Sequence, residues 1–170
     1  MQNRRTCIAA IQDAAHVTFR TASMNTYTLF LLLHLFAAFI FVGTVFFEVL
    51  ILESVRKHVS ERIMAAIEVG IGKRARQIMP WVLLVLYGSG LSMAWNYRAL
   101  LAHPLDSAFG LMLSIKIVLA LSVLGHFFTA MTLRSRGKLV SHLFKGIHIS
   151  VFCHMVGIVL LAKLMFRIGW

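Results

Sequence analysis

The sequence predicts an all-α integral membrane protein, a four-helix bundle with a short amphipathic cytoplasmic connecting helix. Four apolar runs each reach the roughly 20 residues that a helix needs to cross a bilayer. Of the 170 residues, 59% are hydrophobic and only 14% are charged, whereas soluble domains carry about 25% charged residues. Because backbone polar groups in lipid must be satisfied within their own segment, helices are expected rather than open strands.

The four expected helices follow one another along most of the chain. Pro80 is expected to start the second helix, where its missing N–H does no harm. The His103-Pro104 pair is expected to break the chain before the third helix, because the residue before a proline disfavours helical geometry. The expected spans are about 27–52, 79–101, 108–133 and 146–168.

The first 23 residues differ in character from the rest. They are only mildly apolar and lack the long apolar region of a secretory signal. Met24 then opens the first apolar run. Residues 1–23 are therefore interpreted as an N-terminal extension ahead of the native start, and residues 24–170 as the transmembrane domain. A short amphipathic surface helix is the alternative interpretation of the extension.

The connection between the first two spans is long and mixed in character. Val55, Val59, Ile63 and Ile67 recur at near-helical spacing with charged residues between them. This spacing is typical of a helix that lies on a membrane surface with its apolar side inward. It is the predicted amphipathic connecting helix.

Basic residues gather in the first and third connections, and the second connection has only Arg98. The positive-inside rule then places connections one and three in the cytoplasm and both termini on the periplasmic side of a bacterial inner membrane. The net charge of +11 follows from this placement, so we expect contact with lipid headgroups and no binding of nucleic acid. The basic residues are Arg56, Lys57, Arg62, Lys73, Arg74 and Arg76 in the first connection, and Arg134, Arg136, Lys138 and Lys145 in the third.

Ionisable residues inside the apolar runs are the candidate functional residues, because they are costly in a bilayer and their default interpretation is functional. Counted from the periplasmic side, His34 lies ~10 Å deep and Lys116 ~12 Å deep. By the same rise per residue, His126 lies ~27 Å and His154 ~22 Å from that side. The depths predict an outer site of His34 and Lys116 and an inner site of His126 and His154.

Both sites suit a cofactor that is bound between helices. A b-type haem takes histidine or methionine as axial ligands, so His126 with His154 is one candidate pair. His34 with a methionine such as Met93 is another, and these four residues are also the candidate metal ligands.

Two further polar residues lie nearer the cytoplasmic end. Glu48 shares one stripe of its helix with His34, and we expect it to pair with Arg76, His126 or Arg134 or to relay protons. His148 faces about 120° away from His154 on a helix of 100° per residue, so the two are not expected in one pocket. His148 is expected to bind a propionate, a lipid headgroup or water.

Three segments resemble the CopD-like and HemJ-like family of bacterial membrane proteins. They are LHLFAAFIFVGTVFFEVLIL, GKRARQIMPWVLLVLYGSGL and LMLSIKIVLALSVLGHFFTAM, within residues 27–135. HemJ proteins are haem-containing oxidases of protoporphyrinogen IX, and the resemblance implies that their essential histidine and lysine fall on His34 and Lys116. CopD proteins are associated with copper uptake or tolerance. The last helix lacks the Asn-Glu-x-Pro stretch of HemJ, and has HLFKGIHISVFCHMVGIVLL in its place.

The function expected from these features is a haem b-binding, inner-membrane redox protein that transfers electrons or oxidises a porphyrin or quinone, with His34 and Lys116 as catalytic residues. Copper transport or homeostasis is the alternative, because histidine and methionine suit Cu(I). A non-catalytic subunit of a membrane complex is the third hypothesis. Apolar outer faces also favour a homo-oligomer. The sequence has no P-loop, dinucleotide fingerprint or metalloprotease motif.

Overall fold

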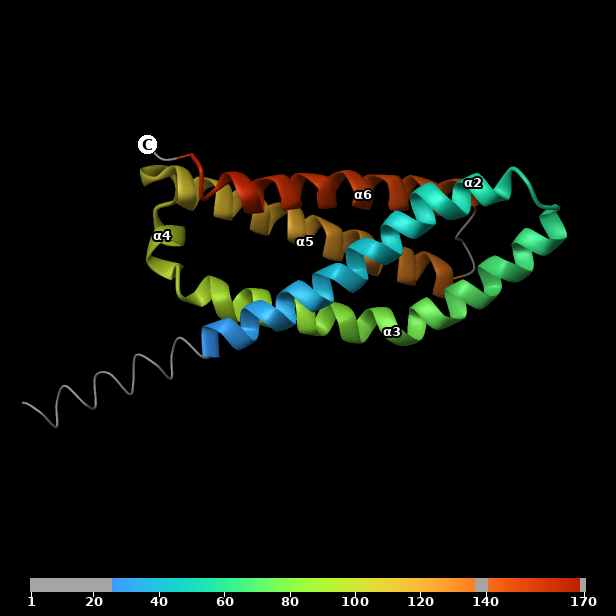
Figure 1. The fold of residues 1–170 in the computed structure, drawn as a ribbon, viewed down its shortest axis with the longest axis horizontal. Helices are drawn as coiled ribbons and strands as arrows, with labels where there is room; N and C mark the ends of the chain where they lie inside the picture. The colour runs from blue at the N-terminus through green and yellow to red at the C-terminus, as the bar shows by residue number, and fades with distance from the viewer. Residues whose placement is uncertain (1–25, 137–140, 169–170) are drawn as a thin grey trace, which may run out of the picture.

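The computed structural model describes residues 26–136 and 141–168, and these residues are helical apart from short turns (Figure 1). Four helices are long and apolar enough to cross a membrane: Thr26–Arg56, Glu61–Trp95, Ala108–Ser135 and Lys145–Leu164. The all-helical class and the number of candidate spans are therefore confirmed. The predicted extension of residues 1–23 lies outside the described residues.

The first helix, Thr26–Arg56, changes its winding near its end. A π-helical segment, η1 (Phe47–Leu52), interrupts the α-helix, which then resumes as α2 (Glu53–Arg56). Each π turn takes one more residue than an α turn, so it widens the helix locally. The segment η1 packs against the last helix of the chain, and Glu48 lies within it.

The second span differs from the expectation, because α3 is a single helix from Glu61 to Trp95 that contains Pro80 in its interior. The expected helix start near residue 79 is wrong. The expected amphipathic connecting helix is not one element either, because Val55 lies in α2, Val59 lies in the bend that follows, and Ile63 and Ile67 lie in the first part of α3. A proline removes only one backbone hydrogen bond, to the carbonyl of Arg76, and it bends a helix more readily than it ends one when both flanks are helix-forming. Figure 1 shows α3 as one curved ribbon.

A compact turn joins α3 to the third span. It contains α4 (Arg98–Ala102) and the 3₁₀ turn η2 (Pro104–Asp106), so the expected end of the second helix at residue 101 falls in α4. The break at Pro104 is confirmed. The helix α5 (Ala108–Ser135) then begins where expected, and the Ser107 hydroxyl caps it by accepting the N–H of Gly110 at 3.1 Å.

The last helix, α6 (Ser141–Leu164), begins and ends earlier than the expected 146–168. It lies beside α5 along the bundle (Figure 1). The buried core is small, and each of the four long helices contributes to it: Ala37, Phe41, Val45, Val82, Leu83, Val123, Val151 and Met155.

Large apolar side chains cover the outside of the bundle. Phe39 is 79% exposed and Leu91 is 73% exposed. Soluble monomers rarely expose continuous apolar patches of this kind. The outer surface therefore suits contact with lipid tails.

The two turns at either end of α3 give a test of membrane topology. Lys57 follows α2 and Asp106 ends η2, and Figure 1 places these turns at opposite ends of the bundle. In a chain whose native cysteines, Cys7 and Cys153, are replaced by alanine, we expect K57C and D106C to react with a membrane-impermeant maleimide from opposite sides. Labelling of both from the same side of intact cells would contradict a membrane crossing by α3.

Candidate functional site

The ionisable residues picked out in the sequence lie in three separate places. His34 lies against α3, His126 and His154 face each other between α5 and α6, and Glu48 contacts His148 between η1 and α6. The prediction that His126 and His154 share a level is thereby met.

The His34 imidazole lies against three residues of α3, which are Leu86, Ser89 and Gly90. Its Nδ1–H donates to the carbonyl oxygen of Leu86 at 2.9 Å, and the Ser89 hydroxyl oxygen is 3.4 Å from the same nitrogen. A Cβ at Gly90 would be 3.0 Å from Cε1 of the ring, so a larger residue there would crowd the imidazole in this position. Because a carbonyl only accepts, the contact fixes the tautomer with the proton on Nδ1.

Two predicted neighbours of His34 belong to this region. Lys116, half-buried on α5, is close enough for its charge to act on the imidazole. Met93 lies one turn beyond Ser89 on α3, and residues one turn apart share a helix face. The Nε2 atom of His34 makes no hydrogen bond to any residue between 26 and 136 or 141 and 168.

The His126 and His154 side chains form a reciprocal arrangement across the α5–α6 contact. Each Nδ1–H donates at 2.7 Å to a carbonyl four residues earlier in its own helix, that of Ser122 or Ser150. Each Nε2 then accepts from the serine hydroxyl of the other helix, at 3.1 Å for His126 with Ser150 and 3.2 Å for His154 with Ser122. The ring centroids are 5.4 Å apart. Four polar side chains are thereby satisfied without water.

The two serines of this cluster do not follow from apolar length or helix depth, but the sequence carries another signal for them. Residues 122–126 read SVLGH and residues 150–154 read SVFCH, so the same Ser-Val-x-x-His pattern occurs once in each helix. Because α5 and α6 run antiparallel, the serine of each pattern meets the histidine of the other. Two copies of one pattern on consecutive membrane helices would have predicted the pairing of serine with histidine.

Glu48 has a different partner from those expected. Its carboxylate lies 2.6 Å from Nε2 of His148, with side-chain exposures of 11% and 21% respectively. The expected partners Arg76, His126 and Arg134 are not paired with it. Because η1 packs against α6, Glu48 contacts α6 rather than α3 or α5. π-helical turns often occur at functional sites.

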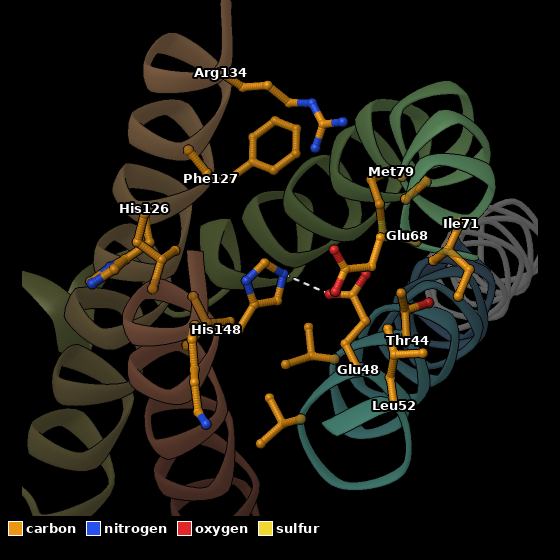
Figure 2. Close-up of a pocket in the computed structure, with 18 of the residues that line it drawn as sticks. Thr44, Glu48, Leu52, Glu68, Ile71, Met79, His126, Phe127, Arg134 and His148 are labelled. Atoms are coloured by element: carbon orange, nitrogen blue, oxygen red, sulfur yellow. Dashed lines mark ion pairs between the residues drawn. The ribbon is translucent and has the colours of Figure 1, made fainter. Parts of the chain in front are cut away.

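A cavity of about 780 Å³ surrounds this pair at the end of the bundle near the two basic connections. The first helix, α3, α5 and α6 all contribute to its walls. Figure 2 shows the His148 ring directed at Glu48 inside the cavity, the His126 ring turned away from them, and Arg134 at the rim. Most of the wall is apolar.

Among residues 26–136 and 141–168, no three or more histidine, cysteine or acidic side chains gather into a group that could hold a metal ion. The histidines instead occur singly or in twos. Haem, which is held by one or two axial ligands, needs no larger group.

Comparison with known proteins adds no assignment. No family model matches the chain, and neither a curated protein nor a solved structure is significantly similar to it. The geometry of the three clusters therefore carries the argument about function.

The reciprocal bonds predict a specific pattern of energetic coupling. In a double-mutant cycle, S150A and H126A should couple by about 0.6 kcal/mol, the average for side-chain hydrogen bonds between membrane helices. S150A and H154A form the matched control, because His154 bonds the Ser150 carbonyl, which alanine retains. The free energy of unfolding in mixed detergent measures both cycles. Equal coupling in the two would contradict the arrangement.

The two glycines on α3 predict opposite effects of one substitution. G88A places its Cβ where no atom lies within 4 Å, so it should stabilise by about 0.5–1 kcal/mol through helix propensity. G90A drives its Cβ against the His34 ring and should lose that gain or destabilise. Unfolding free energies measure both, and a G90A protein as stable as G88A would show that the ring is not confined there.

Proposed function

We propose that this chain is a multi-pass protein of the bacterial inner membrane that binds b-type haem through His34 and transfers electrons, with both termini on the periplasmic side. One observation carries the haem assignment. Nδ1–H of His34 is bonded to the Leu86 carbonyl, while Nε2 has no partner among the described residues. Histidine ligands of metals commonly donate their other ring N–H to a carbonyl, which orients the ring and raises its basicity.

The residues around His34 fit such a ligand. Gly90 leaves room for the ring, and Ser89 lies beside the same nitrogen that Leu86 holds. Lys116 supplies a cation within electrostatic range, suited to a carboxylate on a cofactor or a porphyrin substrate. A bound haem would supply one-electron redox chemistry. The protein's part is to orient the imidazole and to place a positive charge near it.

His126 and His154 remain candidates for haem ligation on the same grounds, with one difference. Each also has Nδ1–H on a carbonyl, but each Nε2 already accepts from a serine hydroxyl. Ligation there requires that hydrogen bond to break, at a net cost of about 1 kcal/mol. His34 has no such bond to lose.

Absorption spectra of the detergent-purified protein from haem-replete cells test the assignment. We expect a Soret band and a resolved α band after reduction with dithionite, both lost or strongly weakened in H34A. The control is H58A, because His58 is exposed in the turn after α2. A wild-type protein without a Soret band, or an H34A spectrum equal to wild type, would overturn His34-ligated haem. H126A and H154A spectra locate any second ligand.

Copper handling is the second candidate function, and Met93 is the observation that favours it. Met93 follows Ser89 by one turn on the α3 face that holds His34. Imidazole and thioether together suit Cu(I). Copper bound by the purified protein under reducing conditions should then fall in both H34A and M93A. Unchanged copper in both variants would exclude this site.

A further inference from the structure

We propose that the cavity between η1, α3, α5 and α6 is a binding site for an anionic amphiphile, a molecule with a carboxylate or phosphate head and an apolar body. Arg76 and Arg134 hold the head, and the apolar walls take the body. This site goes beyond the haem proposal, because ~21 Å of helix rise separates His34 from Glu48. Either proposal can fail without the other.

The size and walls of the cavity fit a small apolar molecule. Its volume of about 780 Å³ falls within the roughly 300–1,000 Å³ of small-molecule sites. Such sites are mainly apolar with a few polar groups that fix orientation. The deep wall is formed by Phe41, Val45, Val49, Met79, Val123 and Phe127.

Two arginines from different helices converge at one point of the rim. Measured from an ideal Cβ at Gly72, a guanidinium nitrogen of Arg76 is 3.4 Å away and two of Arg134 are 3.5 and 3.6 Å away. Like charges this close repel each other, and an anion between them removes the repulsion. Guanidinium groups bind carboxylates and phosphates with two parallel hydrogen bonds. The two arginines thus form a ready anion site beside Gly72.

The carboxylates of the cavity are all paired with residues other than these arginines. Glu48 pairs with His148, Glu53 with Lys145 at 2.5 Å and with Arg56 at 3.3 Å, and Glu68 with Arg56. All three carboxylates that line the cavity therefore have a histidine, lysine or arginine partner other than Arg76 and Arg134. Within the described residues, neither Arg76 nor Arg134 has an ion pair or hydrogen bond from its side chain.

The position of the charges also sets the direction of the ligand. Glu48 lies inside the cavity and would repel an anionic head. The arginines are exposed at the rim. The head therefore lies at the rim and the apolar body points inward, as in a molecule that enters from the headgroup layer of the basic membrane face.

Fluorescence binding to the full-length protein in a neutral detergent tests the site. The probe is 11-(dansylamino)undecanoate, and its methyl ester is the uncharged counterpart. We expect the wild type to bind the carboxylate about tenfold or more tightly than the ester, as two charge-assisted hydrogen bonds imply. The double variant R76Q/R134Q should lose this preference. R136Q is the control, because Arg136 is exposed at the end of α5 and does not line the cavity.

A second variant separates the cavity from surface charge. A130F fills the cavity from α5 while it keeps both arginines, and it should weaken binding of the acid and the ester alike. The proposal is overturned if wild type binds both probes equally, if R76Q/R134Q keeps the preference, or if R136Q loses it as fully. Helix content by circular dichroism confirms that each variant is folded.

The same assay distinguishes two sources of the ligand. In nanodiscs of phosphatidylcholine, the wild type should bind the dansyl acid as it does in detergent. If added phosphatidylglycerol displaces the probe from wild type, the site takes the headgroup of an anionic lipid. If it does not, the ligand is a free amphiphilic acid.

Discussion

Hydrogen bonds from imidazole Nδ1–H to backbone carbonyls determine how the polar groups inside this bundle are arranged. His34 uses a carbonyl of a neighbouring helix, whereas His126 and His154 use carbonyls of their own. In each case the proton is confined to one nitrogen, and the other nitrogen becomes an acceptor with a defined direction. Where that acceptor meets a serine, two helices are joined. Where it meets no described residue, as at His34, it is the atom to which we assign the proposed haem.

The sequence predicts the number of candidate spans and the meeting of His126 with His154 well, because both follow from apolar length and helix rise. The sequence predicts a helix start at Pro80, yet Pro80 lies inside α3, since one missing hydrogen bond does not outweigh helix-forming flanks. The angle between His148 and His154 on their helix predicts that the two lie in different places. Its partner Glu48 comes from η1, and neither the π winding nor the contact of η1 with α6 can be read from local sequence.

The positive charge of the chain has a more particular meaning than membrane orientation alone. Along the first connection and the ends of α5 and α6, Arg56 and Lys145 pair with Glu53 and Glu68, His148 pairs with Glu48, and the guanidinium groups of Arg76 and Arg134 are left over. Orientation by the positive-inside rule needs cations on one side of the bilayer, but does not require them to converge. The convergence at Gly72 is a property of the fold, because it joins residues from α3 and α5.

The uninterrupted course of α3 places residues from both ends of the molecule on one helix. At 1.5 Å per residue it is ~52 Å long, well beyond the ~30 Å of membrane hydrocarbon. Pro80 has no N–H to donate to the Arg76 carbonyl, so α3 bends most easily about one turn after Arg76. Arg76 and Leu86, whose carbonyl accepts the His34 N–H, lie on opposite sides of this point, so the angle of α3 at Pro80 sets where the arginine lies relative to the imidazole.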